Sequence, residues 1–203
     1  YYFAFSGTAL NAIPLQLVLA LTVVIGLTPF IFLPGRKQGL GRWAMGLAGA
    51  MYIGMPFNYY LLLYAAGPHG LSWLGAVVAT VVVADAGALL IGARVGRHPL
   101  LPLVSPKKTW EGAVGGILLA LPVIIIAGWF WLHIAWWHAV ILGVLIGISG
   151  IGGDLVESQM KRLARVKDSS DLIPGHGGVL DRLDSLLFAP IVTYVYASFF
   201  HLL

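Results

Sequence analysis

Long apolar runs, separated by shorter polar connections, dominate the pattern of the chain. Each of these runs extends over roughly the 20 residues that a helix needs to cross a bilayer. The runs occupy residues 10–33, 43–66, 71–92, 112–132, 138–157 and 180–201. The pattern therefore predicts an all-α fold, a polytopic transmembrane helical bundle with about six spans.

No fixed-period repeat or low-complexity segment divides the sequence, so we interpret residues 1–203 as a single integral-membrane domain. The chain begins at Tyr1 without the basic region and small-residue cleavage site of a signal peptide. We expect it to be the interior of a longer polypeptide that is truncated at the N-terminus.

Composition supports a membrane location. Hydrophobic residues make up 59% of the chain and charged residues 10%, whereas soluble domains are roughly 25% charged. The chain has no cysteine, which excludes disulfides and thiolate metal ligands and leaves the redox compartment open. The lipid bilayer is the expected surrounding, and no nucleic-acid partner is expected.

Charge gathers on one side of the predicted bundle. With alternating spans, all 12 Lys and Arg residues and all 8 Asp and Glu residues fall on the same face. The other face keeps His69, His133, His138 and His201 beside Trp73, Trp136 and Trp137. The positive-inside rule places the charged face in the cytoplasm, as in a bacterial-type inner membrane or its equivalent. Carboxylates contribute little to orientation, so this rule does not account for the acids.

Several acids sit in or at the ends of apolar runs, where an ionisable residue costs about 2.5–3.5 kcal/mol and marks a functional site by default. Two sets have helical spacing i, i+3, i+4, which puts each set on one helix face. The sets are Asp154, Glu157, Ser158 and Asp181, Asp184, Ser185. Hard oxygen ligands from two helices suit Mg²⁺. The alternative is that the acids pair with neighbouring bases, for example Glu157 with Lys161 four residues further on.

Basic residues and glycines on the same face form a second pattern. Lys161, Arg162 and Lys167 precede the segment PGHGGV, where Gly177 and Gly178 allow close approach of the backbone to an anion. The start of the last helix adds free N–H groups. A further basic pair, Lys107 and Lys108 in SPKKTWEG, leads into another helix. Carboxylates, bases and a glycine nest at one membrane surface together indicate a polyphosphate chelated by a metal.

The stretch from Ser158 to Asp184, SQMKRLARVKDSSDLIPGHGGVLDRLD, resembles the signature of the CDP-diacylglycerol synthases, also called phosphatidate cytidylyltransferases. Every element of the pattern S-x-x-K-R-x4-K-D-x-S-x-x-I-P-x-H-G-G-x-x-D-R-x-D is in place. SPKKTWEG and DAGALLIGARVGRHPL resemble further segments of that family, so that specific motifs cover about residues 80–190. Residues 1–79 match only as hydrophobic spans.

The resemblance implies an Mg²⁺-dependent enzyme with its active site at the cytoplasmic surface. CTP and phosphatidate would give CDP-diacylglycerol and pyrophosphate by in-line attack of the lipid phosphate on the α-phosphorus. A homodimer and a second cation are left open. The rival interpretations are a CTP-dependent polyprenol kinase, a cytidylyltransferase for another lipid phosphate and a secondary transporter. The internal inverted repeat that many transporters contain is not visible in the sequence.

Site roles follow from the same resemblance. Asp154 and Asp181 are expected to hold the metal with Asp184 as a third ligand or support, and Asp168 would bind a second cation or cap its loop. The expected phosphate clamp and its neighbours are Lys161, Arg162, Lys167, Arg182, Ser158, Gly177 and Gly178, and the catalytic members are Asp154, Asp181, Lys161 and Arg182. His176 would hydrogen-bond a phosphate or order the loop. Lys107 and Lys108 would serve CTP or the lipid headgroup, and Asp85 would meet the cytosine amine, the metal or Arg94.

Overall fold

The computed structural model describes residues 21, 23–25, 28, 39–166, 169–170 and 178–203. Most of the predicted span 10–33 therefore lies outside the described residues, as do Lys167, Asp168, His176 and Gly177. The chain divides into two compact units, Tyr1–Met55 and Pro56–Leu203, and the boundary falls within helix α2, Gly39–Ala65. The organisation of residues 1–203 as one membrane domain stays a prediction.

Helices occupy the later apolar runs. After α2 come α3 (Gly70–Val95), α4 (Trp110–Ala127), the π-helical turn η2 (Gly128–Leu132), α5 (Trp136–Leu163) and α6 (Leu180–Phe199). The clearest difference from the prediction is at α5, which continues to Leu163 instead of ending at residue 157. Lys161 and Arg162 are consequently held on a helix and not in the loop that follows it.

Three helical segments within the described part of the chain are long and apolar enough to cross a membrane. They are Gly70–Val95, Trp110–Leu132 and Trp136–Leu163. The prediction of a mostly helical membrane protein is confirmed, while the count of about six spans stays a prediction. Helix α6 opens with Asp181, Arg182 and Asp184 and is not among the three.

A short β-hairpin interrupts the helical pattern. Strand β1 (Pro99–Leu101) pairs antiparallel with β2 (Ser105–Thr109), within the connection that the all-α prediction treated as irregular. Glu111, in the first turn of α4, fastens this hairpin by accepting hydrogen bonds from the backbone N–H groups of Arg97 (3.1 Å) and His98 (3.2 Å). Thr109 caps α4 by accepting from the N–H of Gly112 at 3.2 Å. The hairpin is therefore held firmly against the start of α4.

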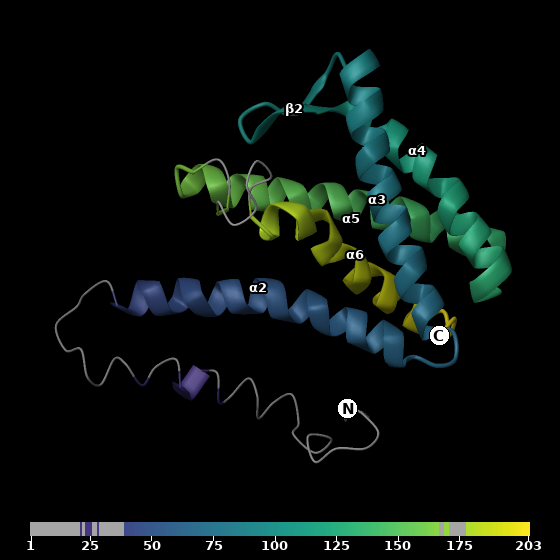
Figure 1. The fold of residues 1–203 in the computed structure, drawn as a ribbon, viewed down its shortest axis with the longest axis horizontal. Coiled ribbons are helices and arrows are strands. Elements are labelled where there is room, and N and C mark those ends of the chain that lie inside the picture. The colour runs from purple at the N-terminus through teal and green to yellow at the C-terminus, as the bar shows by residue number, and fades with distance from the viewer. Residues whose placement is uncertain (1–20, 22, 26–27, 29–38, 167–168, 171–177) are drawn as a thin grey trace. The chain divides into compact units, whose positions relative to one another are not determined.

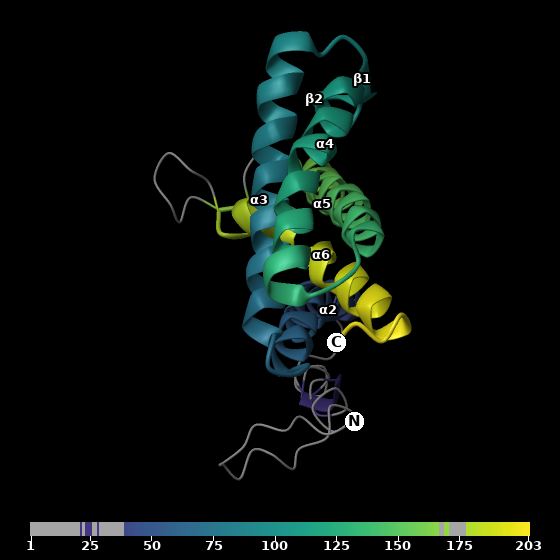
Figure 2. The same ribbon diagram turned by 90° about the vertical axis from the view of Figure 1, so that its right-hand side faces the viewer.

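Within residues 56–203, α3 and α4 lie side by side, and the hairpin connects the end of α3 to the start of α4 (Figure 1 and Figure 2). Small residues bring these helices close: a Cβ added at Gly116 would collide with the carbonyl oxygen of Ala84. Helices α5 and α6 pack against each other in the same way, because a Cβ added at Gly153 would collide with the carbonyl oxygen of Asp184. This close approach fixes the backbone on which the acids of both helices stand.

Candidate active site

Acidic side chains from α5 and α6 converge near the hairpin. Carboxylate oxygens of Asp154, Glu157 and Asp184 lie within 4.8 Å of one another. Glu157 is 1% exposed and Asp184 is 9% exposed. Ser158, one helical turn beyond Asp154, donates a hydrogen bond to Asp154 Oδ1 at 3.2 Å. The predicted helix face of Asp154, Glu157 and Ser158 is therefore present, and Asp184 from α6 completes a group that we call the carboxylate cluster: Asp154, Glu157 and Asp184.

The buried member of this cluster is incompletely satisfied. Glu157 Oε2 forms an ion pair with Lys161 Nζ at 2.6 Å, which is the pairing that helical spacing suggested. Glu157 Oε1 is buried and has no hydrogen-bond partner among the described residues. Leaving a buried charged oxygen without a partner costs free energy, so such a group either takes up a proton or is compensated by a ligand or a positive charge.

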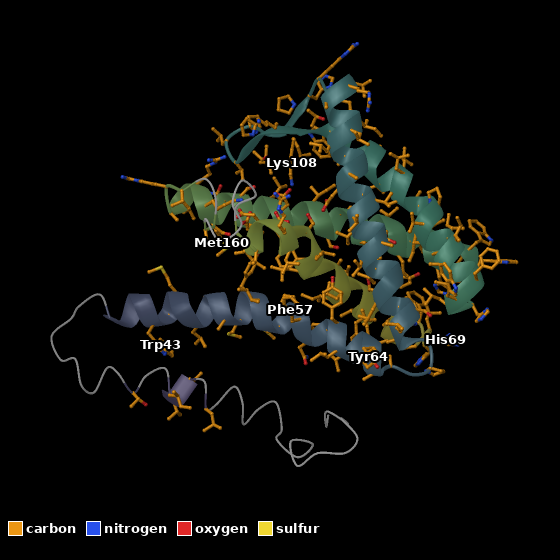
Figure 3. The ribbon with its side chains drawn as sticks, viewed as in Figure 1. Trp43, Phe57, Tyr64, His69, Lys108 and Met160 are labelled. Atoms are coloured by element: carbon orange, nitrogen blue, oxygen red, sulfur yellow. The ribbon has the colours of Figure 1, made fainter. Side chains whose placement is uncertain are left out.

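Two residues from earlier in the chain reach the cluster. Lys108 on β2 forms an ion pair with Asp154 Oδ2 and points from the hairpin toward α5 (Figure 3). Asp85 on α3 lies close enough to Asp154, Lys108 and Ser185 to interact with each of them. Its carboxylate also interacts electrostatically with Asp184. Among the three roles left open for Asp85, this placement favours the metal region over a pair with Arg94, whose guanidinium donates to the carbonyl of Leu90 at 3.5 Å.

Asp181 has a different environment. Its Oδ1 accepts from Lys161 Nζ at 2.6 Å, and its Oδ2 accepts from the backbone N–H of Ser169 (2.9 Å), the Ser169 hydroxyl (2.7 Å) and the N–H of Gly178 (2.7 Å). Both carboxylate oxygens of Asp181 therefore have hydrogen-bond partners within the described residues. Asp181 thus ties Ser169 and Gly178 to Lys161.

This arrangement bears on several predicted roles. Asp181 is not part of the carboxylate cluster in the described structure, so its role as a metal ligand stays a prediction. The N–H of Gly178, which we expected to face a phosphate, donates to Asp181 instead. Arg162 Nε donates to the carbonyl oxygen of Val104 in the hairpin at 3.4 Å. Arg182 is exposed on the first turn of α6, and Lys107 is exposed on β2.

Sequence reasoning did not identify two features of the site. It left Glu157 open between the metal site and a pair with Lys161, whereas the structure gives Glu157 both the pair and a place in the cluster. The spacing of Asp154 and Glu157 at i, i+3 was the available signal. It also left Lys108 without a definite partner, because no local pattern connects residue 108 with Asp154. That contact depends on how the hairpin folds over α5.

The fold and the site together define a helical membrane protein with a candidate cation and phosphate site at one end of its bundle. Residues 2–200 match the cytidylyltransferase family, and the chain therefore belongs to that family. The family resemblance inferred from the signature is confirmed.

Several curated relatives carry the name phosphatidate cytidylyltransferase. The protein of Staphylococcus saprophyticus is 35% identical over 184 residues, which cover 90% of this chain and 69% of that protein. The protein of Bacillus subtilis is 38% identical over 155 residues, 74% of this chain and 56% of the relative. The protein of Mycobacterium tuberculosis is 38% identical over 127 residues, 63% of this chain. The chain spans only 39% of the length of this last relative.

Proposed function

We propose that the protein is an integral-membrane phosphatidate cytidylyltransferase that converts CTP and phosphatidate into CDP-diacylglycerol and pyrophosphate. The observation that carries this proposal is the carboxylate cluster with Lys108 and Lys161 beside it, at the end of three apolar helices. Membership of the cytidylyltransferase family and the names of the relatives support the same reaction.

The donor set of the site fits Mg²⁺. Mg²⁺ prefers hard oxygen ligands and uses one or two carboxylates while keeping positions for water and substrate phosphate. Asp154, Glu157 and Asp184 would hold the ion, and the unpartnered Oε1 of buried Glu157 is the oxygen that most needs it. When bound, the ion would neutralise charge on the triphosphate and on the departing pyrophosphate.

The residues of the chain would contribute mainly position and charge. The attacking phosphate oxygen of phosphatidate is already anionic, so no side chain has to remove a proton. As its bond to the α-phosphorus forms, the bond from that phosphorus to the bridging oxygen of the β-phosphate breaks, and pyrophosphate leaves. Lys161 is held in place by Glu157 and Asp181, and it would donate to the phosphates from a fixed position.

The orientation of the site is a further part of the proposal. We place the hairpin end of the bundle in the cytoplasm, because the Lys and Arg residues that the structure describes within 56–203 lie in the hairpin, at the end of α3, at the end of α5 and at the start of α6. The chain has no native cysteine, so single cysteines introduced in the segment 97–108 should react with a membrane-impermeant maleimide only from the cytoplasmic side. A cysteine introduced near Trp136 should react only from the outside, and the reverse pattern would contradict the placement.

The reaction itself separates this proposal from a lipid kinase. CTP would be offered with phosphatidate, with a polyprenol and with a polyprenyl phosphate in mixed micelles. A cytidylyltransferase releases pyrophosphate and leaves CMP on the lipid, whereas a CTP-dependent kinase releases CDP. We expect pyrophosphate with phosphatidate, and the release of CDP with a polyprenol would overturn the proposal.

A further inference from the structure

Lys108 lies beside the carboxylate cluster and contacts it through Asp154. Its ammonium contacts Asp154 Oδ2, and it is the only cation paired with Asp154 among the described residues. Both side chains are partly shielded from solvent, with 25% of Lys108 and 29% of Asp154 exposed. An ion pair with this degree of shielding is screened less by water and salt than an exposed one.

The charge balance around the cluster makes this contact significant. Asp85 joins the carboxylates of Asp154, Glu157 and Asp184 within electrostatic range. Lys161 compensates Glu157, but it is shared with Asp181. Among the interactions given for the described residues, Lys108 is consequently the cation that compensates Asp154, and it also acts on Asp85.

Hydrogen bonds of the hairpin hold the backbone of Lys108 in place. Strand β2 is paired with β1, and its last residue, Thr109, caps α4. The N–H of Trp110 donates to the carbonyl oxygen of His98 at 2.9 Å, and Arg162 holds the carbonyl oxygen of Val104. The hairpin therefore fixes the point from which the lysine side chain reaches Asp154.

We propose that Lys108 is a built-in counter-cation of the carboxylate cluster, which competes with a divalent cation for Asp154. The inference rests on the proposed function only in that the cluster binds a divalent cation. An ammonium and a divalent ion repel each other at the same carboxylate, so each weakens the binding of the other. Lys108 in this respect acts on cation binding through Asp154.

The test measures cation binding without substrate. Mn²⁺ would serve as a probe for Mg²⁺, and free Mn²⁺ would be followed by electron paramagnetic resonance with the full chain in detergent. Lys108→Met keeps the length of the side chain and removes its charge. We expect this variant to bind Mn²⁺ at least about tenfold more tightly than the unaltered protein, which corresponds to about 1.4 kcal/mol.

The neighbouring residue provides a matched control. Successive side chains of a strand point to opposite faces, and Lys107 is exposed. Lys107→Met removes the same charge from the same strand, and its Mn²⁺ affinity should stay within about twofold of the unaltered value. Adding Asp154→Asn to Lys108→Met should remove the gain, since the ion would no longer find the carboxylate for which Lys108 competes.

A second readout keeps the inference testable if Lys108→Met is less stable. In EDTA this variant should have a lower Tm than the unaltered protein, because the carboxylates have lost their counter-cation. Addition of Mn²⁺ should raise the Tm of the variant by more than it raises the Tm of the unaltered protein. A purely structural ion pair predicts an equal loss of Tm with and without Mn²⁺ and no gain in affinity. That result would overturn the inference.

Neither readout depends on turnover, so the two proposals can fail separately. If Lys108→Met binds Mn²⁺ more tightly but the unaltered protein forms no CDP-lipid, the counter-cation role is upheld and the proposed reaction is rejected. If the unaltered protein forms CDP-diacylglycerol but Lys108→Met binds Mn²⁺ equally or more weakly, the proposed reaction is upheld and the counter-cation role is rejected. Absence of Mn²⁺ binding in the unaltered protein would reject the counter-cation as well.

Discussion

The two ends of the bundle formed by α3 to α6 both contain buried polar side chains, but they satisfy them differently. At the end opposite the hairpin, where His69 precedes α3 (Figure 3), the buried imidazole of His138 hydrogen-bonds through Nδ1 to the Tyr196 hydroxyl at 2.9 Å. Its ring also packs against Trp137 and Phe200, with centroid separations of 3.4 Å and 5.2 Å. The buried imidazole at this end therefore has a hydrogen-bond partner within the chain.

The hairpin end is incomplete by the same criterion. Three carboxylates approach one another, and one buried oxygen of Glu157 has no hydrogen-bond partner among the described residues. The comparison shows that a polar residue inside a membrane bundle is a weak sign of function when neighbouring side chains satisfy it. It becomes a strong sign when the chain supplies too little positive charge, because a ligand is then needed to offset the cost.

The largest expected effect comes from removing a charge that the cluster needs for a cation. Asp184→Asn keeps the shape of the side chain and loses its charge, so we expect kcat for CDP-diacylglycerol formation to fall by more than about 100-fold. Steady-state kinetics with Mg²⁺ varied would measure this. Near-normal turnover at saturating Mg²⁺, in a variant with an unchanged circular dichroism spectrum, would remove Asp184 from the site.

Asp181 tests the distinction between cation binding and positioning. Asp181→Asn weakens the contacts to Lys161, Ser169 and Gly178, and we expect kcat to fall about 10- to 100-fold. Asp181 lies outside the carboxylate cluster in the described structure but shares Lys161 with Glu157. Removing its charge leaves Lys161 to Glu157 alone, so Mn²⁺ affinity should fall, by less than about tenfold. Loss of Mn²⁺ binding in this variant would instead make Asp181 a metal ligand, as its place in the signature suggests.

Glu157 sharpens the comparison at its most buried point. Glu157→Gln removes the charge but keeps a side chain that can accept a hydrogen bond from Lys161. We expect the Mg²⁺ concentration for half-maximal turnover to rise about tenfold, with a smaller change in kcat at saturation. An unchanged Mg²⁺ requirement would indicate that Glu157 serves only to hold Lys161.

The smallest effect on activity is expected at the completed end. Tyr196→Phe removes the hydroxyl that hydrogen-bonds His138, which should lower the free energy of unfolding by about 1 kcal/mol. Turnover should remain within about twofold of the unaltered protein, since the hydroxyl lies at the end of the bundle away from the carboxylate cluster. Thermal unfolding and the pyrophosphate assay would be run on the same preparation, and a large loss of turnover without a loss of stability would contradict the comparison.

The sequence predicted those parts of the structure that depend on local periodicity. Apolar runs gave the helices from residue 43 onward with small errors at their ends, and i, i+3, i+4 spacing placed Asp154, Glu157 and Ser158 on one face. The sequence did not predict the hairpin, because the hydrogen bonds that fasten it join the backbone N–H groups of Arg97 and His98 to the distant side chain of Glu111.

The candidate site was predicted less completely for a similar reason. Asp181 and Asp184 are three residues apart on one helix, and spacing alone gave them related roles. Their tertiary partners differ in part: Asp181 meets Lys161, Ser169 and Gly178 and also lies near Glu157, whereas Asp184 joins Asp154 and Glu157 in the carboxylate cluster. Contacts between separate helices and loops determine which partners each aspartate has, and the spacing of residues along one sequence does not predict those contacts.

The central claim is that the carboxylate cluster makes nucleotide transfer to the lipid dependent on a divalent cation. The most direct measurement uses CTP labelled at the α-phosphate, phosphatidate in mixed micelles and a Mg²⁺ titration, with the unaltered protein and Asp154→Asn side by side. The account predicts that label enters CDP-diacylglycerol only with Mg²⁺ and that Asp154→Asn transfers less than about 1% as much. Transfer of label in EDTA, or equal transfer by the two proteins at the same Mg²⁺ concentration, would contradict it.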